Sequence, residues 1–64
     1  MNNQETKIAN KMFELSKGEE ERQEIQWCID QVDADKKTFL EAVEWCGLDS
    51  EYYRAKKEVE GGTK

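Results

Sequence analysis

Residues 25–32 read Ile25-Gln26-Trp27-Cys28-Ile29-Asp30-Gln31-Val32 and contain the cleanest apolar stripe in the chain. Its members are spaced by three or four residues, which places them on one face of an α-helix: Ile25, Cys28, Ile29 and Val32. Trp27 lies on the flank of that face. With the preceding Glu19-Glu20-Glu21, which suits the positive end of a helix dipole, the pattern predicts a helix over residues 19–31.

Three more helices are predicted around this one, over residues 4–16, 36–46 and 50–60. Each has an apolar stripe of its own: Ile8, Met12 and Leu15 in the first, Phe39, Ala42, Val43 and Cys46 in the second, and Tyr52, Ala55 and Val59 in the third. Gly18 and Gly47 are expected to follow the ends of two helices, because glycine is common at that position.

Short polar residues mark the predicted helix starts. Thr38 with Glu41 has the spacing of a capping box, in which each side chain bonds the other residue's backbone N–H. Asp33 or Asp35 is a further candidate to cap the helix over residues 36–46. For the last helix, the N-cap candidates are Asp49 and Ser50, since Asp and Ser are favoured there.

The length of 64 residues allows one domain, residues 1–64, and the absence of proline leaves the helices uninterrupted. We therefore expect an all-α fold, a small bundle of three to four short helices with a helix-turn-helix-like C-terminal half. The ends, about residues 1–4 and 61–64, should fray. A chain this short buries only about 60% of its unfolded surface, so its own core is marginal.

Composition also predicts where the protein works. The sequence has no run of 18 apolar residues, so no membrane association is expected. Residues 1–6 are polar and lack the basic-then-apolar order of a signal peptide. We therefore expect a cytoplasmic protein whose two cysteines are reduced thiols.

The usual catalytic groups are scarce. There is no histidine, so no side chain has an unperturbed pKa near neutrality. Cys28 and Cys46 have no histidine base and lie on predicted core stripes, where cysteine usually packs as a small hydrophobe. The echo of Trp27-Cys28 in Trp45-Cys46 is explained by two similar helices that pack together. We predict no catalytic residue, no metal site and no cofactor.

One stretch resembles the calcium loop of the EF-hand family. Within residues 33–44, acidic and apolar residues stand at the spacings of that loop: Asp33, Asp35, Leu40, Glu41 and Glu44. The twelve-residue resemblance implies a calcium site, but Lys37 stands at a ligand position and Thr38 replaces the glycine of the sharp turn. We therefore expect a capped helix start here and no bound calcium.

Residues 39–59 have the proportions of a helix-turn-helix, with Gly47 in the turn. In that alternative, the second helix would contact DNA through Arg54, Lys56 and Lys57. The same helix contains Glu51, Glu58 and Glu60, and a net charge of −5 neutralises phosphates poorly. A DNA-binding transcription regulator is therefore the second hypothesis.

The acidity is concentrated in one segment. Residues 19–35 contain seven acidic side chains and one basic side chain, a net charge of −6. Glu20, Glu21 and Glu24 predict a compact negative face that would steer toward a basic groove on a larger protein, as a mimic of nucleic-acid phosphates would. Large rings of the kind enriched at interface hot spots accompany it, although we expect at least two of them to pack in the ordinary way: Trp27, Trp45, Tyr52 and Tyr53.

The leading hypothesis is a small, acidic, non-catalytic interaction module, in the style of bacterial or phage proteins. It would act as a stoichiometric regulator or inhibitor that docks on a larger protein through the acidic helix. A third hypothesis is a homo-oligomeric structural protein, whose marginal core is completed by further copies of the chain.

Overall fold

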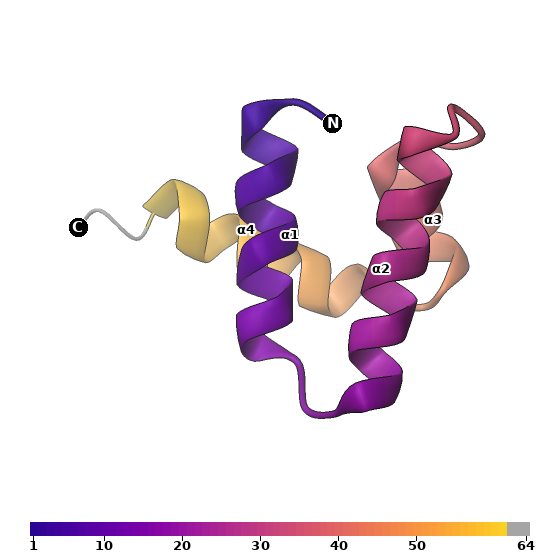
Figure 1. Ribbon diagram of the computed structural model, residues 1–64. Helices are drawn as coiled ribbons and strands as arrows, with labels where there is room; N and C mark the ends of the chain where they lie inside the picture. The colour runs from indigo at the N-terminus through magenta and orange to yellow at the C-terminus, as the bar shows by residue number, and fades with distance from the viewer. Residues whose placement is uncertain (62–64) are drawn as a thin grey trace.

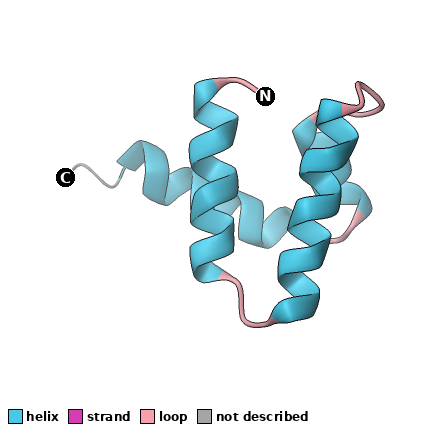
Figure 2. Ribbon diagram, viewed as in Figure 1, coloured by secondary structure: helices cyan, strands magenta, loops and turns pink. Residues whose placement is uncertain are grey.

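The computed structural model describes residues 1–61, and these form four helices and no strand (Figure 2). The helices are α1 (Asn3–Leu15), α2 (Glu19–Asp33), α3 (Phe39–Trp45) and α4 (Asp49–Gly61). The predicted all-α bundle is therefore confirmed. Gly61, the first residue of the tail expected to fray, is instead the last residue of α4, and residues 62–64 lie outside the described residues. Within residues 1–61, none of the helices is both long and apolar enough to cross a membrane.

The helices pack as two pairs. α1 packs mainly against α4, and α2 packs mainly against α3, with smaller contacts between α1 and α2 and between α3 and α4. In Figure 1, α1 and α2 run antiparallel in front, while α4 crosses behind α1 and α3 lies behind α2. The predicted packing of the two Trp-Cys helices on each other is confirmed, because these are α2 and α3.

The core takes side chains from all four helices and from the turn before α4. Its buried members are Ile8, Ala9, Met12, Ile25, Cys28, Phe39, Ala42, Val43, Leu48, Tyr52 and Ala55. The predicted stripes supply most of them, which confirms the assignment of the buried face in each helix. Other stripe members are only partly buried against this core: Leu15, Ile29, Val32, Cys46 and Val59.

α1 begins earlier than predicted. The Asn2 side chain accepts a hydrogen bond from the Glu5 N–H at 2.7 Å, and the Glu5 carboxylate accepts one from the Asn2 N–H at 3.3 Å. This capping box places Asn3, which we expected to be frayed, inside the helix. Gln4 also donates a hydrogen bond of 2.7 Å to Glu60 of α4.

The end of α2 corrects the predicted caps of α3. Asp33 is the last residue of α2, and Asp35 follows it with a left-handed φ of 61°. The Lys36 N–H donates to the Gln31 carbonyl at 2.9 Å and the Asp35 N–H to the Val32 carbonyl at 3.0 Å. This is a Schellman motif, in which a left-handed residue lets the chain satisfy the last helical carbonyls. Both aspartates therefore belong to the end of α2.

α3 begins at Phe39, three residues later than predicted. The Glu41 N–H donates to the Thr38 hydroxyl at 3.2 Å, and the Thr38 N–H donates to the Glu41 carboxylate at 3.0 Å. The predicted capping box is confirmed. Because Thr38 is the N-cap, Lys36 and Lys37 lie in the connection before the helix.

The turn between α3 and α4 is a second Schellman motif, with Gly47 at φ 73°. The Leu48 N–H donates to the Val43 carbonyl at 2.9 Å and the Gly47 N–H to the Glu44 carbonyl at 3.1 Å. Leu48 is buried, as the residue after the left-handed position usually is. The Tyr52 N–H bonds the Leu48 carbonyl at 2.8 Å, so Leu48 occupies the N-cap position predicted for Asp49 or Ser50.

Candidate protein-interaction groove

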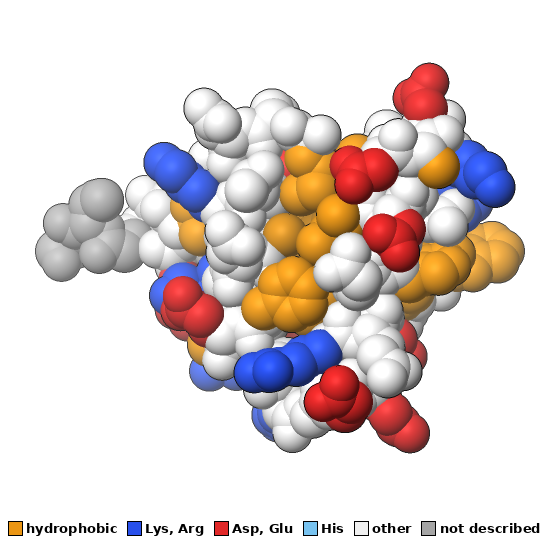
Figure 3. Space-filling model, viewed as in Figure 1, with side chains coloured by type: hydrophobic (Ala, Val, Ile, Leu, Met, Phe, Trp, Pro, Cys, Tyr) orange, Lys and Arg blue, Asp and Glu red, His pale blue; other side chains and the backbone are white. Residues whose placement is uncertain are grey.

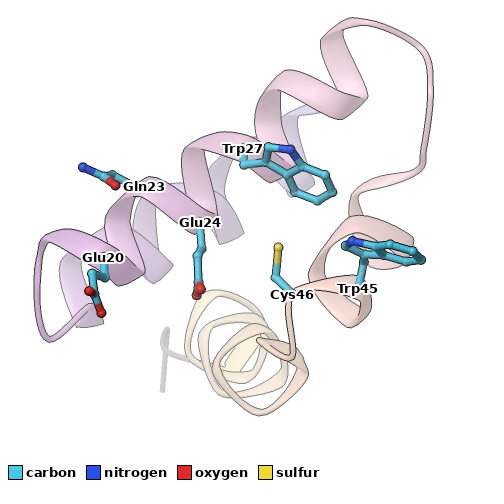
Figure 4. Close-up of a pocket in the computed structure, with 6 residues that line it drawn as sticks. All are labelled: Glu20, Gln23, Glu24, Trp27, Trp45 and Cys46. Atoms are coloured by element: carbon cyan, nitrogen blue, oxygen red, sulfur yellow. The ribbon is translucent and has the colours of Figure 1, made fainter.

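An open groove of about 690 Å³ lies between α2 and the end of α3 (Figure 4). Two carboxylates, two indole rings, an amide and a thiol line it: Glu20, Glu24, Trp27, Trp45, Gln23 and Cys46. In Figure 4 the two indoles lie at one end of the groove and the Glu20 carboxylate lies toward the other. We call this feature the α2–α3 groove.

Helical spacing explains why one side of α2 supplies most of the lining. Glu20, Glu24 and Trp27 are separated by four and three residues, so they share a face of the helix. That face adjoins the buried stripe, and Trp27 is therefore half-buried against the core while part of its ring remains in the groove. The acidic and aromatic parts of the groove are thus held by a single regular element.

Trp45 supplies the opposite wall and is the most unusual side chain of the structure. It is 73% exposed, although tryptophan is mostly buried in folded proteins. Lys37 Nζ lies 4.9 Å from the centroid of the Trp45 ring, a cation–π contact. Trp45 also lines a second hollow of about 450 Å³, with Lys37 and three further residues, Lys36, Glu41 and Glu44. The ring therefore stands as a ridge between two depressions.

The carboxylates of the groove are available to a partner. The ion pairs within residues 1–61 join Lys11 to Glu14 and Glu58, and Arg54 to Glu58, so Glu20 and Glu24 are not part of them. Both side chains are exposed. An incoming cation would therefore gain their attraction without first displacing another cation of this chain.

The two thiols meet beside the groove. Cys28 is fully buried and donates a hydrogen bond of 3.9 Å to the Cys46 sulfur. Burial raises the pKa of the Cys28 thiol to about 12, and the neighbouring Cys46 adds to this shift. Cys46 is only partly buried and lines the groove. The predicted core role therefore describes Cys28 better than Cys46.

Three residues of the predicted partner surface are not brought to this groove. Glu21 accepts a hydrogen bond from the Lys17 N–H at 3.1 Å, in the connection between α1 and α2. Tyr52 is 8% exposed, and its ring centroid lies 5.7 Å from that of Phe39 in the core. Tyr53 is half-exposed on α4 and packs edge-on against Tyr52 at 5.2 Å. The structure thus separates Glu21 from Glu20 and Glu24, and both tyrosines from both tryptophans.

The basic residues of the DNA-binding hypothesis all lie on α4 and away from the groove. Arg54 Nε is 3.9 Å from a Glu58 carboxylate oxygen, and Lys56 is half-buried. Lys57 is exposed. The helix that precedes the turn, α3, has seven residues. The helix-turn-helix proportions are present, but acidic residues interrupt the basic surface of α4.

The stretch that resembles a calcium loop is divided between two helix ends. Asp33 and Asp35 terminate α2, while Glu41 is engaged in the capping box of α3. The Thr38 backbone N–H, and then its hydroxyl, hold the pKa of Glu41 below its ordinary value of 4.5. Among residues 1–61, no three acidic or cysteine side chains are grouped closely enough to hold a metal ion.

Two lining residues were not among the predicted site residues. Gln23 lies three residues after Glu20 and four before Trp27, so helical spacing alone would have found it. Cys46 was assigned to the core, and only the packing of α3 on α2 shows that it also borders the groove.

Comparison with models of known protein families, with curated proteins and with solved structures gives no match for this chain. The function is therefore argued from the site itself.

Proposed function

We propose that this protein is a non-catalytic interaction module whose α2–α3 groove binds a basic segment of a larger protein. The observation that carries the proposal is the exposure of Trp45, at 73%, opposite a helix face with two free carboxylates. Exposing the apolar surface of a tryptophan to water is unfavourable in free energy, and tryptophan is a preferred anchor residue at interfaces. Binding would make the protein a stoichiometric regulator or inhibitor of its partner.

The carboxylates and the indole rings of the groove together favour a partner segment rich in Arg and Lys. Arginine and lysine side chains pair with carboxylates through their cationic ends and also pack on the faces of indole rings. The contact between Lys37 and Trp45 shows within the chain itself that this ring accepts a cation. An Arg- or Lys-rich segment satisfies both walls of the groove, whereas an acidic or purely apolar segment satisfies at most one.

Two further parts of the proposal concern chemistry and location. The absence of histidine from the sequence, and an open groove in place of an enclosed cleft, favour binding over catalysis. A reducing compartment such as the cytoplasm suits a protein with two free thiols, and we propose that location.

The two tryptophans make the test direct, because they are the only ones in the chain and both line the groove. A peptide rich in Arg and Lys but free of aromatic residues is titrated into the protein, and tryptophan emission is recorded at several salt concentrations. We expect a saturable change that weakens as salt rises. A peptide with Glu at the basic positions should produce no change.

Matched variants separate the groove from net charge. The pair Glu20→Gln and Glu24→Gln should weaken binding by about three- to tenfold, as expected for two partly screened ion pairs. The control pair Glu19→Gln and Asp30→Asn removes the same charge from the same helix outside the groove. Equal losses for the two pairs, or no binding by the wild type, would refute the proposal.

Trp45→Ala should weaken peptide binding more than the charge variants do, by more than about tenfold, because truncated anchor rings usually cost most. Its readout is the emission of Trp27 or calorimetry. Circular dichroism should be unchanged, since the ring is mostly exposed.

DNA binding remains the second candidate, supported by the Gly47 turn between α3 and α4. Because α4 mixes both charges, we expect no retardation of duplex DNA even at low salt. Clear retardation that disappears when Arg54, Lys56 and Lys57 are neutralised would favour this candidate over the interaction module.

Homo-oligomer formation is the third candidate. Figure 3 shows hydrophobic side chains gathered between α1 and α2 on one face of the molecule. Such a strip is the kind of surface that a second copy would cover. Light scattering across a hundredfold concentration range measures the mass, and a mass that stays at one chain would exclude this candidate.

A further inference from the structure

The two cysteines of the sequence are 18 residues apart, yet their side chains are neighbours. Cys28 Sγ, from the middle of α2, and Cys46 Sγ, from the end of α3, are 3.9 Å apart. A disulfide bond has a sulfur–sulfur length of about 2.05 Å, so the two sulfurs need to approach by about 1.9 Å. Side-chain rotation within a contact of this kind moves a sulfur by such amounts, without separation of the helices.

We propose that Cys28 and Cys46 form an oxidisable dithiol, which a small-molecule disulfide converts into an intramolecular disulfide between α2 and the end of α3. The pair differs from a lone reactive cysteine because each thiol has its reaction partner already in place. The proposed binding uses the carboxylates and the indole rings, so it does not require either thiol.

The unequal burial of the two thiols sets the order of the steps. Cys46 borders the groove, so its thiolate can attack one sulfur of a small disulfide such as oxidised glutathione. A bond forms between Cys46 and that sulfur, and the other glutathione leaves as a thiolate. Cys28 is 0% exposed and cannot meet the reagent directly.

The second step uses the buried thiol. Cys28 loses its proton to solvent and attacks the Cys46 sulfur of the mixed disulfide, which releases the second glutathione as a thiolate. In total, two protein thiols are oxidised and one small disulfide is reduced to two thiols. Burial raises the pKa of Cys28 to about 12, so this step should be slow at neutral pH and accelerate as the pH rises.

The product would join the two walls of the α2–α3 groove covalently. Cys46 lines that groove directly and Cys28 follows Trp27, so the bond would fix the position of both tryptophans relative to each other. Any effect of this bond on partner binding rests on the proposed function, whereas the chemistry of the thiol pair does not.

The test oxidises the full chain under native conditions with oxidised glutathione at pH 7.5 and 8.5. Remaining thiols are then alkylated and the protein is digested with trypsin. Cleavage at Arg22, Lys36, Lys37 and Arg54 leaves Cys28 in peptide 23–36 and Cys46 in peptide 38–54. We expect these two peptides to be joined by a disulfide, faster at pH 8.5, with no disulfide-linked pair of chains in the mass spectrum.

Two variants check the order of steps. Cys28→Ser should stop at a mixed disulfide with one glutathione on Cys46. Cys46→Ser should react more than about tenfold more slowly, because only the buried thiol remains. Circular dichroism verifies that each variant is folded, and the peptide map of the wild type tests the pairing without any variant.

Thermal unfolding gives an independent readout. A native disulfide that closes a loop of this size should raise Tm on the order of 10 °C in a domain this small. The proposal is overturned if the wild type stops at the mixed disulfide at both pH values. It is equally overturned if joined peptides arise only between two chains, or if the oxidised monomer melts no higher than the reduced one.

Discussion

Two residues with very different side chains adopt the same left-handed conformation after the ends of α2 and α3. Asp35 has φ 61° and Gly47 has φ 73°, and each is the left-handed residue of a Schellman motif. Glycine adopts this conformation without a steric penalty, whereas a residue with a Cβ does not. The end of α3 is therefore relaxed, while the end of α2 contains a residue that is tolerated but not optimal.

Gly47→Ala should destabilise the protein by about 1–2 kcal/mol, because alanine pays the cost of the left-handed conformation. A Cβ at this position meets no atom within 4 Å, so the loss would come from the backbone and not from a clash. Gly47→Asn is the control, since asparagine tolerates this conformation better. Urea unfolding measures both variants, and equal stability of the alanine variant and wild type would contradict the assigned turn.

Asp35→Gly should have the opposite effect and stabilise the protein, on the order of 0.5 kcal/mol after the greater freedom of glycine in the unfolded chain is counted. The same substitution five residues earlier provides the control. Asp30 is exposed and lies in the interior of α2, and Asp30→Gly should destabilise by about 0.5–1 kcal/mol. Urea midpoints that move in the same direction for both variants would argue against the left-handed position of Asp35.

At the scale of one element, α3 is short and depends on its ends. It has seven residues, fewer than an isolated helix needs in water. The capping box of Thr38 and Glu41 satisfies N–H groups at its start, the Schellman motif satisfies carbonyls at its end, and three buried residues hold it to the core. This short helix nevertheless presents Trp45 to the groove, so its caps matter for the site as well as for the fold.

The capping box should make part of the stability depend on pH. The pKa of Glu41 is lowered in the folded protein by its hydrogen bonds with Thr38. Folding therefore favours the charged form, so this contribution is complete above the ordinary pKa of 4.5 and is lost as the pH falls through the lower folded value. The stability difference between wild type and Glu41→Ala should be present at pH 7 and shrink toward zero below that range.

Urea unfolding at several pH values between 7 and acidic pH measures this difference. Thr38→Ala is the companion variant and should cost about 1 kcal/mol at neutral pH. Glu41→Gln is the control for the side chain's shape, because its amide oxygen still accepts from Thr38 but does not titrate. A gap between wild type and Glu41→Ala that stays constant with pH would show that the carboxylate does not cap the helix.

At the scale of the whole molecule, the two helix pairs contribute differently to the core and to the groove. α1 and α4 form much of the core through Ile8, Met12 and Ala55, and they meet again at the polar contact between Gln4 and Glu60. α2 and α3 complete the core from one side and build the groove from the other. A domain of this size buries little surface in total, so each large core residue represents a considerable part of its stability.

Met12→Ala should therefore be severe. Met12 is 1% exposed, and its truncation should cost about 2–5 kcal/mol, enough to bring a small domain close to unfolding at room temperature. Trp45→Ala removes a larger side chain but should cost less than about 1 kcal/mol, because the ring is 73% exposed and loses mainly its contact with Lys37. Thermal melts followed by circular dichroism compare the two, and a reversed order would contradict the assigned core.

The sequence by itself determined what depends on neighbours along the chain. Helical spacing marked the buried faces, including Ile25 with Cys28 and Tyr52 with Ala55, and it placed Trp27 on the flank of one of them. The capping box at Thr38 and the turn at Gly47 were also readable, because both are formed by residues at most five apart. The left-handed conformation of Asp35 was not predicted. A glycine after a helix indicates this conformation, whereas an aspartate does not.

Only the tertiary structure decided which side chains from different helices lie next to one another. The packing of α3 on α2 brings Trp45 opposite Glu24 and Trp27, and it sets Cys28 against Cys46. The packing of α3 against α4 also sets the rings of Phe39 and Tyr52 against each other, with centroids 5.7 Å apart. Periodicity states which face of a helix is buried but not which other helix covers it, because that choice depends on the shapes and volumes of side chains far apart in the sequence. The acidic segment could therefore be predicted as a partner surface, whereas the groove that gives it an aromatic wall could not.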